Sequence, residues 1–266
     1  MARMIGAFKI IGKLGDVSAY HRKDSGDTVF VRYSGGPTSA QIKNSPSFEN
    51  FRERSREFGG CGKGGGVLRK GALPVSELRD YNIVSEFNKI CNSLLALDTT
   101  SPPGERRISF SKARFLFEGF NFNKNRLLDT VLRNPIYCSV QRETCSASID
   151  IPEVVPRINF FPPDNKAIYR FALSFSIIHD MGYTPWLGYQ PLNDQFQDRP
   201  VNVFSDWHKV DHRHEAQQVN ISIPNGIVND TANLMLAIGI EFRTSLEGEE
   251  GLCKKNGGVA KILAFR

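Results

Sequence analysis

A histidine-rich segment carries the side chains in this sequence that are best suited to bind a metal. Asp206, His208, His212 and His214 share one parity, so a β-strand there would present all four on one face. A carboxylate and imidazoles are ligands that Zn²⁺ and similar ions accept. Their spacing matches no recognised closed site, and the charged neighbours favour a solvated loop or a polar contact between subunits. We therefore expect no metal or other cofactor, with these four residues as the candidates should a metal bind.

The run Gly59–Gly66, with six glycines in eight positions, invites comparison with a phosphate-binding loop. A Walker A loop needs G-x-x-x-x-G-K-[ST], but Glu57 stands where the first glycine belongs and Gly64 stands where the hydroxyl belongs. This excludes the Walker A interpretation and leaves two alternatives. The run is either a loop, or a helix whose bare backbone lets another element approach closely.

No pattern in the sequence indicates nucleophilic catalysis. There is no G-x-S-x-G elbow and no cysteine in a known catalytic context. The five cysteines favour reduced, mostly buried thiols, and a bridge, if one forms, would join Cys138 to Cys145. We therefore expect a protein that is not an enzyme.

Positive charge is concentrated at the N-terminal end of the 266-residue chain, whose formal net charge is +6. Residues 1–72 hold 13 Lys and Arg against 6 Asp and Glu, a net of +7, whereas the remaining 21 basic and 22 acidic residues give −1. Such a segment suits nucleic acid, anionic lipid or an acidic face on a neighbouring subunit. Because acids are interspersed, we expect an ordered face and not a tail.

The N-terminus shows no signal peptide, since its first apolar run is far too short, and no stretch reaches the roughly 20 apolar residues of a membrane span. We expect synthesis in the cytoplasm. Release as part of an extracellular or phage-like assembly would need a dedicated route.

The first 104 residues mix strands with helices. Val17–Tyr20 and Thr28–Tyr33 predict a β-hairpin. Ser45-Pro46 opens a predicted helix with a phenylalanine stripe, and a second helix is predicted from Ser76 to Leu97. Residues 98–104 form the clearest linker.

From residue 108 onward the apolar period falls towards two. Ile168–Ile178 alternates strictly, and further predicted strands surround Ile221, cover Leu234–Phe242 and cover Val259–Phe265. The predicted class is therefore α+β. It comprises an N-terminal β-hairpin with two helices (1–104) followed by an antiparallel β-sandwich (105–266).

Several motifs resemble a family of uncharacterised proteins common in the Bacteroidota. They are Gly6, Lys9, Gly12, Leu14-Gly15-Asp16, Gly35-Gly36-Pro37, Pro46, Phe48, Arg52-Glu53, Glu57-Phe58-Gly59, Lys63, Gly66, Leu68-Arg69, Phe117-Glu118-Gly119-Phe120-Asn121-Phe122-Asn123 and Gly239-Ile240-Glu241-Phe242. The resemblance is good over residues 5–70 and looser afterwards. It implies one long helix through the glycine run and a shared scaffold, but it transfers no catalytic residue.

These observations favour a structural subunit that assembles with copies of itself into a filament, tube or phage-like particle. The residues expected at the interface are Phe48, Phe51, Phe58, Arg52, Arg54, Arg56, Gly62 and Gly66. One alternative is a protein that binds nucleic acid or another anionic ligand through the basic N-terminal face. Another is a sandwich that binds a glycan or a metal at residues 208–214.

Overall fold

The computed structural model describes residues 2–4, 11–24, 26, 28–33, 35–193, 199–244, 253 and 255–266, so Gly6 and Lys9 lie outside the described residues. Helices combine with several antiparallel sheets, which confirms the predicted α+β class. The chain forms two compact units, Met1–Arg52 and Glu53–Arg266, whereas the sequence predicted a boundary at residue 104. The difference arises because the helices after residue 52 pack on the C-terminal sheets.

The N-terminal unit contains a four-stranded antiparallel sheet in the order β1-β4-β3-β2. Its strands are β1 Ala2–Met4, β2 Gly12–Leu14, β3 Val17–His21 and β4 Val29–Tyr33. The predicted hairpin corresponds to β3 and β4, and β1 and β2 extend it at both edges. Helix α1 (Ser39–Asn44) starts at Thr38, whose side chain accepts a hydrogen bond from the Gln41 N–H while the Gln41 side chain accepts from Thr38.

The glycine run lies within one helix, α2 (Glu49–Gly71), which follows the 3₁₀ turn η1 (Pro46–Phe48). The helical alternative is therefore the right one for residues 59–66. The second predicted helix is divided into η2 (Val75–Leu78) and α3 (Val84–Leu95). The Asn82 side chain, which accepts a hydrogen bond from the Val84 N–H, marks the restart of helical structure.

The C-terminal unit is built on a long antiparallel sheet in the order β10-β7-β13-β14, with β11 also pairing with β7. Its strands are β7 Ile168–His179, β10 Val201–Phe204, β11 His208–Lys209, β13 Ala232–Arg243 and β14 Gly258–Phe265. A second sheet, in the order β12-β6-β5, contains β5 Tyr137–Gln141, β6 Ser146–Ile151 and β12 Gln217–Ser222. Strands β8 (Met181–Thr184) and β9 (Gly188–Pro191) form a hairpin. Three short elements complete the unit: η3 Phe110–Lys112, η4 Arg114–Leu116 and α4 Leu128–Val131.

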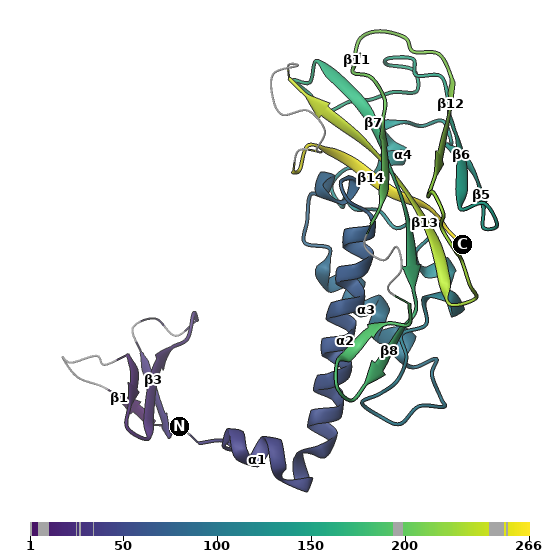
Figure 1. Cartoon of the computed structure of the whole chain (residues 1–266). Helices are drawn as coiled ribbons and strands as arrows, with labels where there is room; N and C mark the ends of the chain where they lie inside the picture. Colours follow the sequence, from purple (N-terminus) through teal and green to yellow (C-terminus); the bar gives the residue numbers. More distant parts are fainter. Residues whose placement is uncertain are drawn as a thin grey trace. The chain divides into compact units, whose positions relative to one another are not determined.

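Two apolar clusters cover the two faces of the β7–β13–β14 sheet, because successive strand residues point to opposite sides. On one side, Ala172 and Ile178 of β7 pack with residues of α2 and α3. On the other side, Phe171 and Phe175 pack with residues of β6 and β12. Figure 1 shows α2 and α3 together on one side of the long sheet, and β5, β6 and β12 on the other.

All five cysteines are free thiols, and Cys61, Cys91, Cys145 and Cys253 are buried. No helix among the described residues combines the length and the apolar character needed to cross a membrane.

Candidate functional site

Helix α2 packs against the rest of the C-terminal unit mainly through the backbone of its glycines, and its phenylalanines are not among its buried residues. Its buried residues are Glu57, Gly60, Cys61, Gly64, Gly65, Val67, Leu68 and Gly71. A methyl group at Gly60 would stand 2.6 Å from the ring of Tyr189, and one at Gly71 would stand 2.6 Å from Ile178 Cδ1. These glycines therefore allow an approach that no larger residue permits.

The opposite side of α2 bears small and apolar residues, which are exposed except for the half-buried Gly66. We call Ser55, Phe58, Gly59, Gly62 and Gly66 the α2 outer face; at 3.6 residues per turn they share one stripe of the helix. Phe58 is 69% exposed. A methyl group added at any of these three glycines would meet no atom within 4 Å. Nothing in the described chain therefore accounts for glycine at these positions.

The predicted interface residues are distributed over this region in different environments. Phe51 is 56% exposed and Phe48 is half-buried, so Phe51 and Phe58 do not fasten α2 to the chain's own core. Arg52 donates hydrogen bonds to the carbonyls of Ile42 and Ser45, at 2.8 and 2.9 Å. Arg52 is therefore engaged within the N-terminal unit.

Two of the predicted interface arginines, Arg54 and Arg56, are exposed on α2. The Arg56 guanidinium lies over the Tyr183 ring, 5.5 Å from its centroid. Both cations therefore remain accessible to an acidic partner.

The β8–β9 hairpin lies along one margin of the α2 outer face. Lys63 donates hydrogen bonds to the carbonyls of Tyr189 at 2.9 Å and of Leu187 at 3.5 Å. The turn of this hairpin carries Trp186, which is 94% exposed, and Leu187, which is 68% exposed. The hairpin thus adds two large apolar side chains to the exposed surface beside α2.

A second candidate site lies between the edge strands of the two C-terminal sheets. It is a hollow of about 290 Å³, which we call the histidine hollow. Its apolar lining comes from Ile151, Phe171, Leu173, Val203, Phe204 and Val219.

The five polar residues of the histidine hollow are Ser205, Asp206, His208, His214 and Gln217. The rings of His208 and His214 are 3.9 Å apart between centroids. Buried nitrogens of three side chains, His208 Nε2, His214 Nδ1 and Gln217 Nε2, have no hydrogen-bond partner among the described residues. Because an unsatisfied buried polar atom is destabilising, these nitrogens mark the hollow as a place for a ligand.

The structure brings together part of the predicted metal set. Strand β11 ends at Lys209 and the chain turns there, since the His212 N–H donates to the Lys209 carbonyl. His212 is exposed and pairs with Asp211 at 2.6 Å. No group of three His, Cys, Asp or Glu side chains in the described part of the chain is arranged to hold a metal ion.

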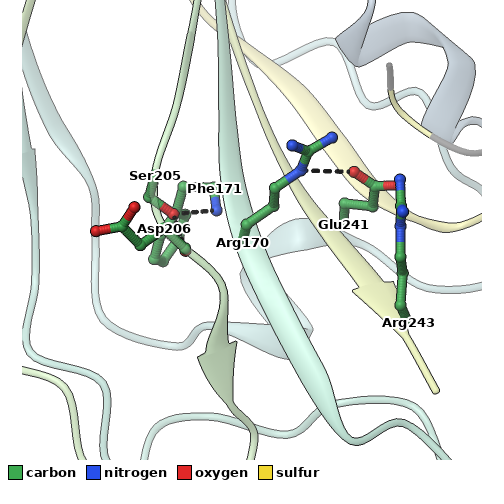
Figure 2. A network of polar contacts seen from close by, with 6 residues as sticks. All are labelled: Arg170, Phe171, Ser205, Asp206, Glu241 and Arg243. Carbon is green, nitrogen blue, oxygen red and sulfur yellow. Dashed lines mark hydrogen bonds and ion pairs between the residues drawn. The ribbon is translucent and has the colours of Figure 1, made fainter. Parts of the chain in front are cut away.

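A buried ionic network holds the segment that bears Asp206 and His208 (Figure 2). Glu241 accepts hydrogen bonds from Arg170 at 2.9 Å and from Arg243 at 3.1 Å, and its side chain is fully buried. Both guanidiniums lie over the Trp207 ring, at 4.7 and 4.8 Å from its centroid. These two contacts hold the Trp207 side chain, which lies between Asp206 and His208 in the sequence.

Ser205 connects the same segment to β7. Its hydroxyl accepts a hydrogen bond from the Phe171 N–H at 2.9 Å and donates to the Asp206 carbonyl at 2.9 Å (Figure 2). His208 pairs directly opposite Tyr169 of β7. Burial, reinforced by the neighbouring His214, lowers the pKa of His208, so this imidazole is neutral at physiological pH.

Sequence reasoning missed Gln217, Trp207 and Trp186. Alternation along residues 217–222 placed Gln217 on a strand but gave no sign of the hollow. The sequence Pro185-Trp186-Leu187-Gly188 is a turn signal that could have drawn attention to an exposed tryptophan. Comparison with known proteins adds no assignment, because no known family, curated protein or solved structure matches this chain.

Proposed function

We propose that this protein is a structural subunit that assembles with copies of itself, and that the α2 outer face is one of its contacts. The observation that carries this proposal is that a methyl group added at Gly59, Gly62 or Gly66 would meet no atom within 4 Å. Each glycine inside an exposed helix is less favourable than alanine by about 1 kcal/mol. A helix of a second copy packed against the bare backbone gives these glycines a role.

The surroundings of these glycines fit the same contact. Phe58 on the outer face and Trp186 beside it are 69% and 94% exposed. Large exposed apolar side chains that gather on one surface are typical of protein–protein interfaces. Arg54 and Arg56 flank the outer face and provide charges that acids of the second copy would meet.

A polymer needs a second contact, because a single symmetric contact ends at a dimer. We infer that the edge strands β1 and β2 of the N-terminal sheet provide it. Their outer sides are unpaired among the described residues, and an edge strand can extend the sheet of another copy. In this proposal the two C-terminal sheets form a β-sandwich that serves as the body of the subunit.

The test is the mass of the full-length chain by light scattering and its appearance by negative-stain electron microscopy, for wild type and two variants. Gly62→Leu places a bulky residue where the second helix would approach, yet leucine is a better helix former than glycine. Asn92→Leu is the matched control, because it adds the same side chain to an exposed position of α3.

We expect regular polymers or oligomers of wild type and Asn92→Leu, and smaller species of Gly62→Leu. A wild-type monomer at every concentration would refute self-assembly. A monomer whose mass changes only when DNA or RNA is added would favour nucleic-acid binding instead.

A further inference from the structure

The histidine hollow has the composition of a small-molecule site that is separate from the proposed assembly surface. Its volume of about 290 Å³ lies close to the lower end of the range for ligand pockets, roughly 300–1,000 Å³. Six apolar residues and five polar residues line it. This combination suits a compact molecule with a single polar end.

The charge of the hollow indicates the polar end that it would accept. Asp206 is the only charged side chain among the described residues that line it. His208 and His214 lie 3.9 Å apart between ring centroids, so two imidazolium charges there would repel each other. A neutral imidazole offers a lone pair on one nitrogen, which accepts a hydrogen bond.

The hollow therefore presents several hydrogen-bond acceptors. The Asp206 carboxylate and the imidazole lone pairs all favour a donor that carries positive charge. Gln217 completes the polar side, since an amide can present either its oxygen or its nitrogen to the same point. The ring of Phe171 adds aromatic surface, which also favours a cation.

We propose that the histidine hollow binds a small protonated amine whose apolar body lies against Phe171, Leu173 and Val203. The ammonium group would donate hydrogen bonds to His208, His214 and the Asp206 carboxylate. A metal ion is less well served, because the described side chains offer no group of three metal ligands.

Three small molecules that share an aromatic ring and differ in their polar group test this assignment. Benzylamine, benzyl alcohol and benzoate would be titrated into the full-length protein, with binding followed by calorimetry and by NMR of the histidine side chains. We expect saturable binding of benzylamine, weaker binding of the alcohol and the weakest binding of benzoate. Equal or tighter binding of benzoate, or no saturable response to benzylamine, would overturn the proposal. A response to Zn²⁺ alone would assign the hollow to a metal instead.

Variants locate the binding. Asp206→Asn removes the charge of an exposed residue and should weaken benzylamine about tenfold, as the loss of a charge-assisted hydrogen bond predicts. His214→Ala should have a similar effect. His212→Ala is the matched control, because His212 points to Asp211 outside the hollow and should leave the affinity unchanged.

The assignment would be contradicted if His212→Ala weakened benzylamine binding as much as Asp206→Asn does, or if Asp206→Asn had no effect on it. The thermal unfolding midpoint of each variant shows whether it is folded. Should His214→Ala unfold, Asp206→Asn still decides the question. The binding of benzylamine does not depend on assembly. The proposal of amine binding and the proposal of self-assembly are therefore tested independently.

Discussion

The ring of Tyr189 lies directly against the backbone of Gly60, so that a methyl group on Gly60 would stand 2.6 Å from Cγ of the ring. The ring cannot easily move away, because the Tyr189 hydroxyl donates a hydrogen bond of 2.8 Å to the Arg106 carbonyl. This contact joins the β8–β9 hairpin to α2.

Alanine at two nearby glycines should therefore change stability in opposite directions. Gly60→Ala should lower the free energy of unfolding by about 1–3 kcal/mol through overpacking. Gly62→Ala, which meets no atom within 4 Å, should raise it by up to about 1 kcal/mol through helix propensity. Urea denaturation of dilute protein measures both. Equal effects of the two substitutions would show that Tyr189 does not constrain Gly60.

The Arg170–Glu241–Arg243 network should be sensitive to the loss of its acid. Glu241→Gln would remove the carboxylate that Arg170 and Arg243 share, and these two side chains are only 6% and 12% exposed. We expect a loss of about 3–5 kcal/mol in the free energy of unfolding. Glu86→Gln is the control, because the pair of Glu86 with Lys124 is exposed and should contribute at most about 1 kcal/mol. Similar losses in both variants would argue against a structural role for the buried network.

Stability should fall on acidification because two buried carboxylates have lowered pKa values. The hydrogen-bonded Arg106 guanidinium lowers the pKa of Glu57 below its ordinary 4.5. Burial alone would raise the pKa of Asp98, but hydrogen bonds from Arg107, Ser101 and Thr100 hold it well below its ordinary 3.8. A group with a lowered folded-state pKa stabilises the fold above its unfolded-state pKa and loses this contribution as the pH falls.

We therefore expect the unfolding midpoint to drop below about pH 4.5, and to drop less steeply in Asp98→Asn. Circular dichroism melts across the acid range measure this. Asp180 acts with the opposite sign, since burial raises its pKa, and it would favour folding at lower pH. An Asp98→Asn variant with the acid response of wild type would contradict the assignment.

Salt should weaken the proposed assembly if Arg54 and Arg56 meet acids of a second copy. The Debye length falls from about 10 Å at 0.1 M salt to about 3 Å at 1 M, which screens exposed charge pairs. Light scattering should show smaller species at the higher salt concentration. Arg54→Gln with Arg56→Gln should lower both the extent of assembly and its dependence on salt. Assembly that strengthens with salt would indicate an apolar contact without a charge contribution.

The long strands could be predicted because their local pattern and their environment agree. Along β7, Tyr169, Phe171 and Leu173 alternate with smaller or polar residues, and both sets prove to be buried on opposite faces. Helix α3 begins later than predicted, because the chain leaves helical geometry after Leu78 and restarts beside Asn82. Periodicity alone does not register such an interruption.

The orientation of α2 could not be predicted from hydrophobicity. Phe51 and Phe58 are its most apolar residues, so periodicity places them in the core, yet they are exposed. A glycine adds no hydrophobic signal, although Gly60 and Gly71 bring α2 into close contact with its own unit. Close packing of the backbone depends on the opposing surface, which lies far away in the sequence.

Shared parity predicted Asp206, His208, His212 and His214 on one face of a strand, and it gave no sign of the hollow. The turn after Lys209 removes His212 from the set, and His214 is then held by backbone hydrogen bonds to Val154. Such long-range pairing is invisible to local spacing.

The burial of the cysteines makes this chain convenient for chemical labelling. Burial raises the pKa of Cys61 to about 11 and that of Cys253 to about 12, so very little reactive thiolate exists there at neutral pH. A cysteine introduced at an exposed position such as Asn92 would react with a maleimide dye far faster. Fluorescent reporters of subunit exchange can therefore be attached without replacing the four buried thiols, and only the half-buried Cys138 needs replacement.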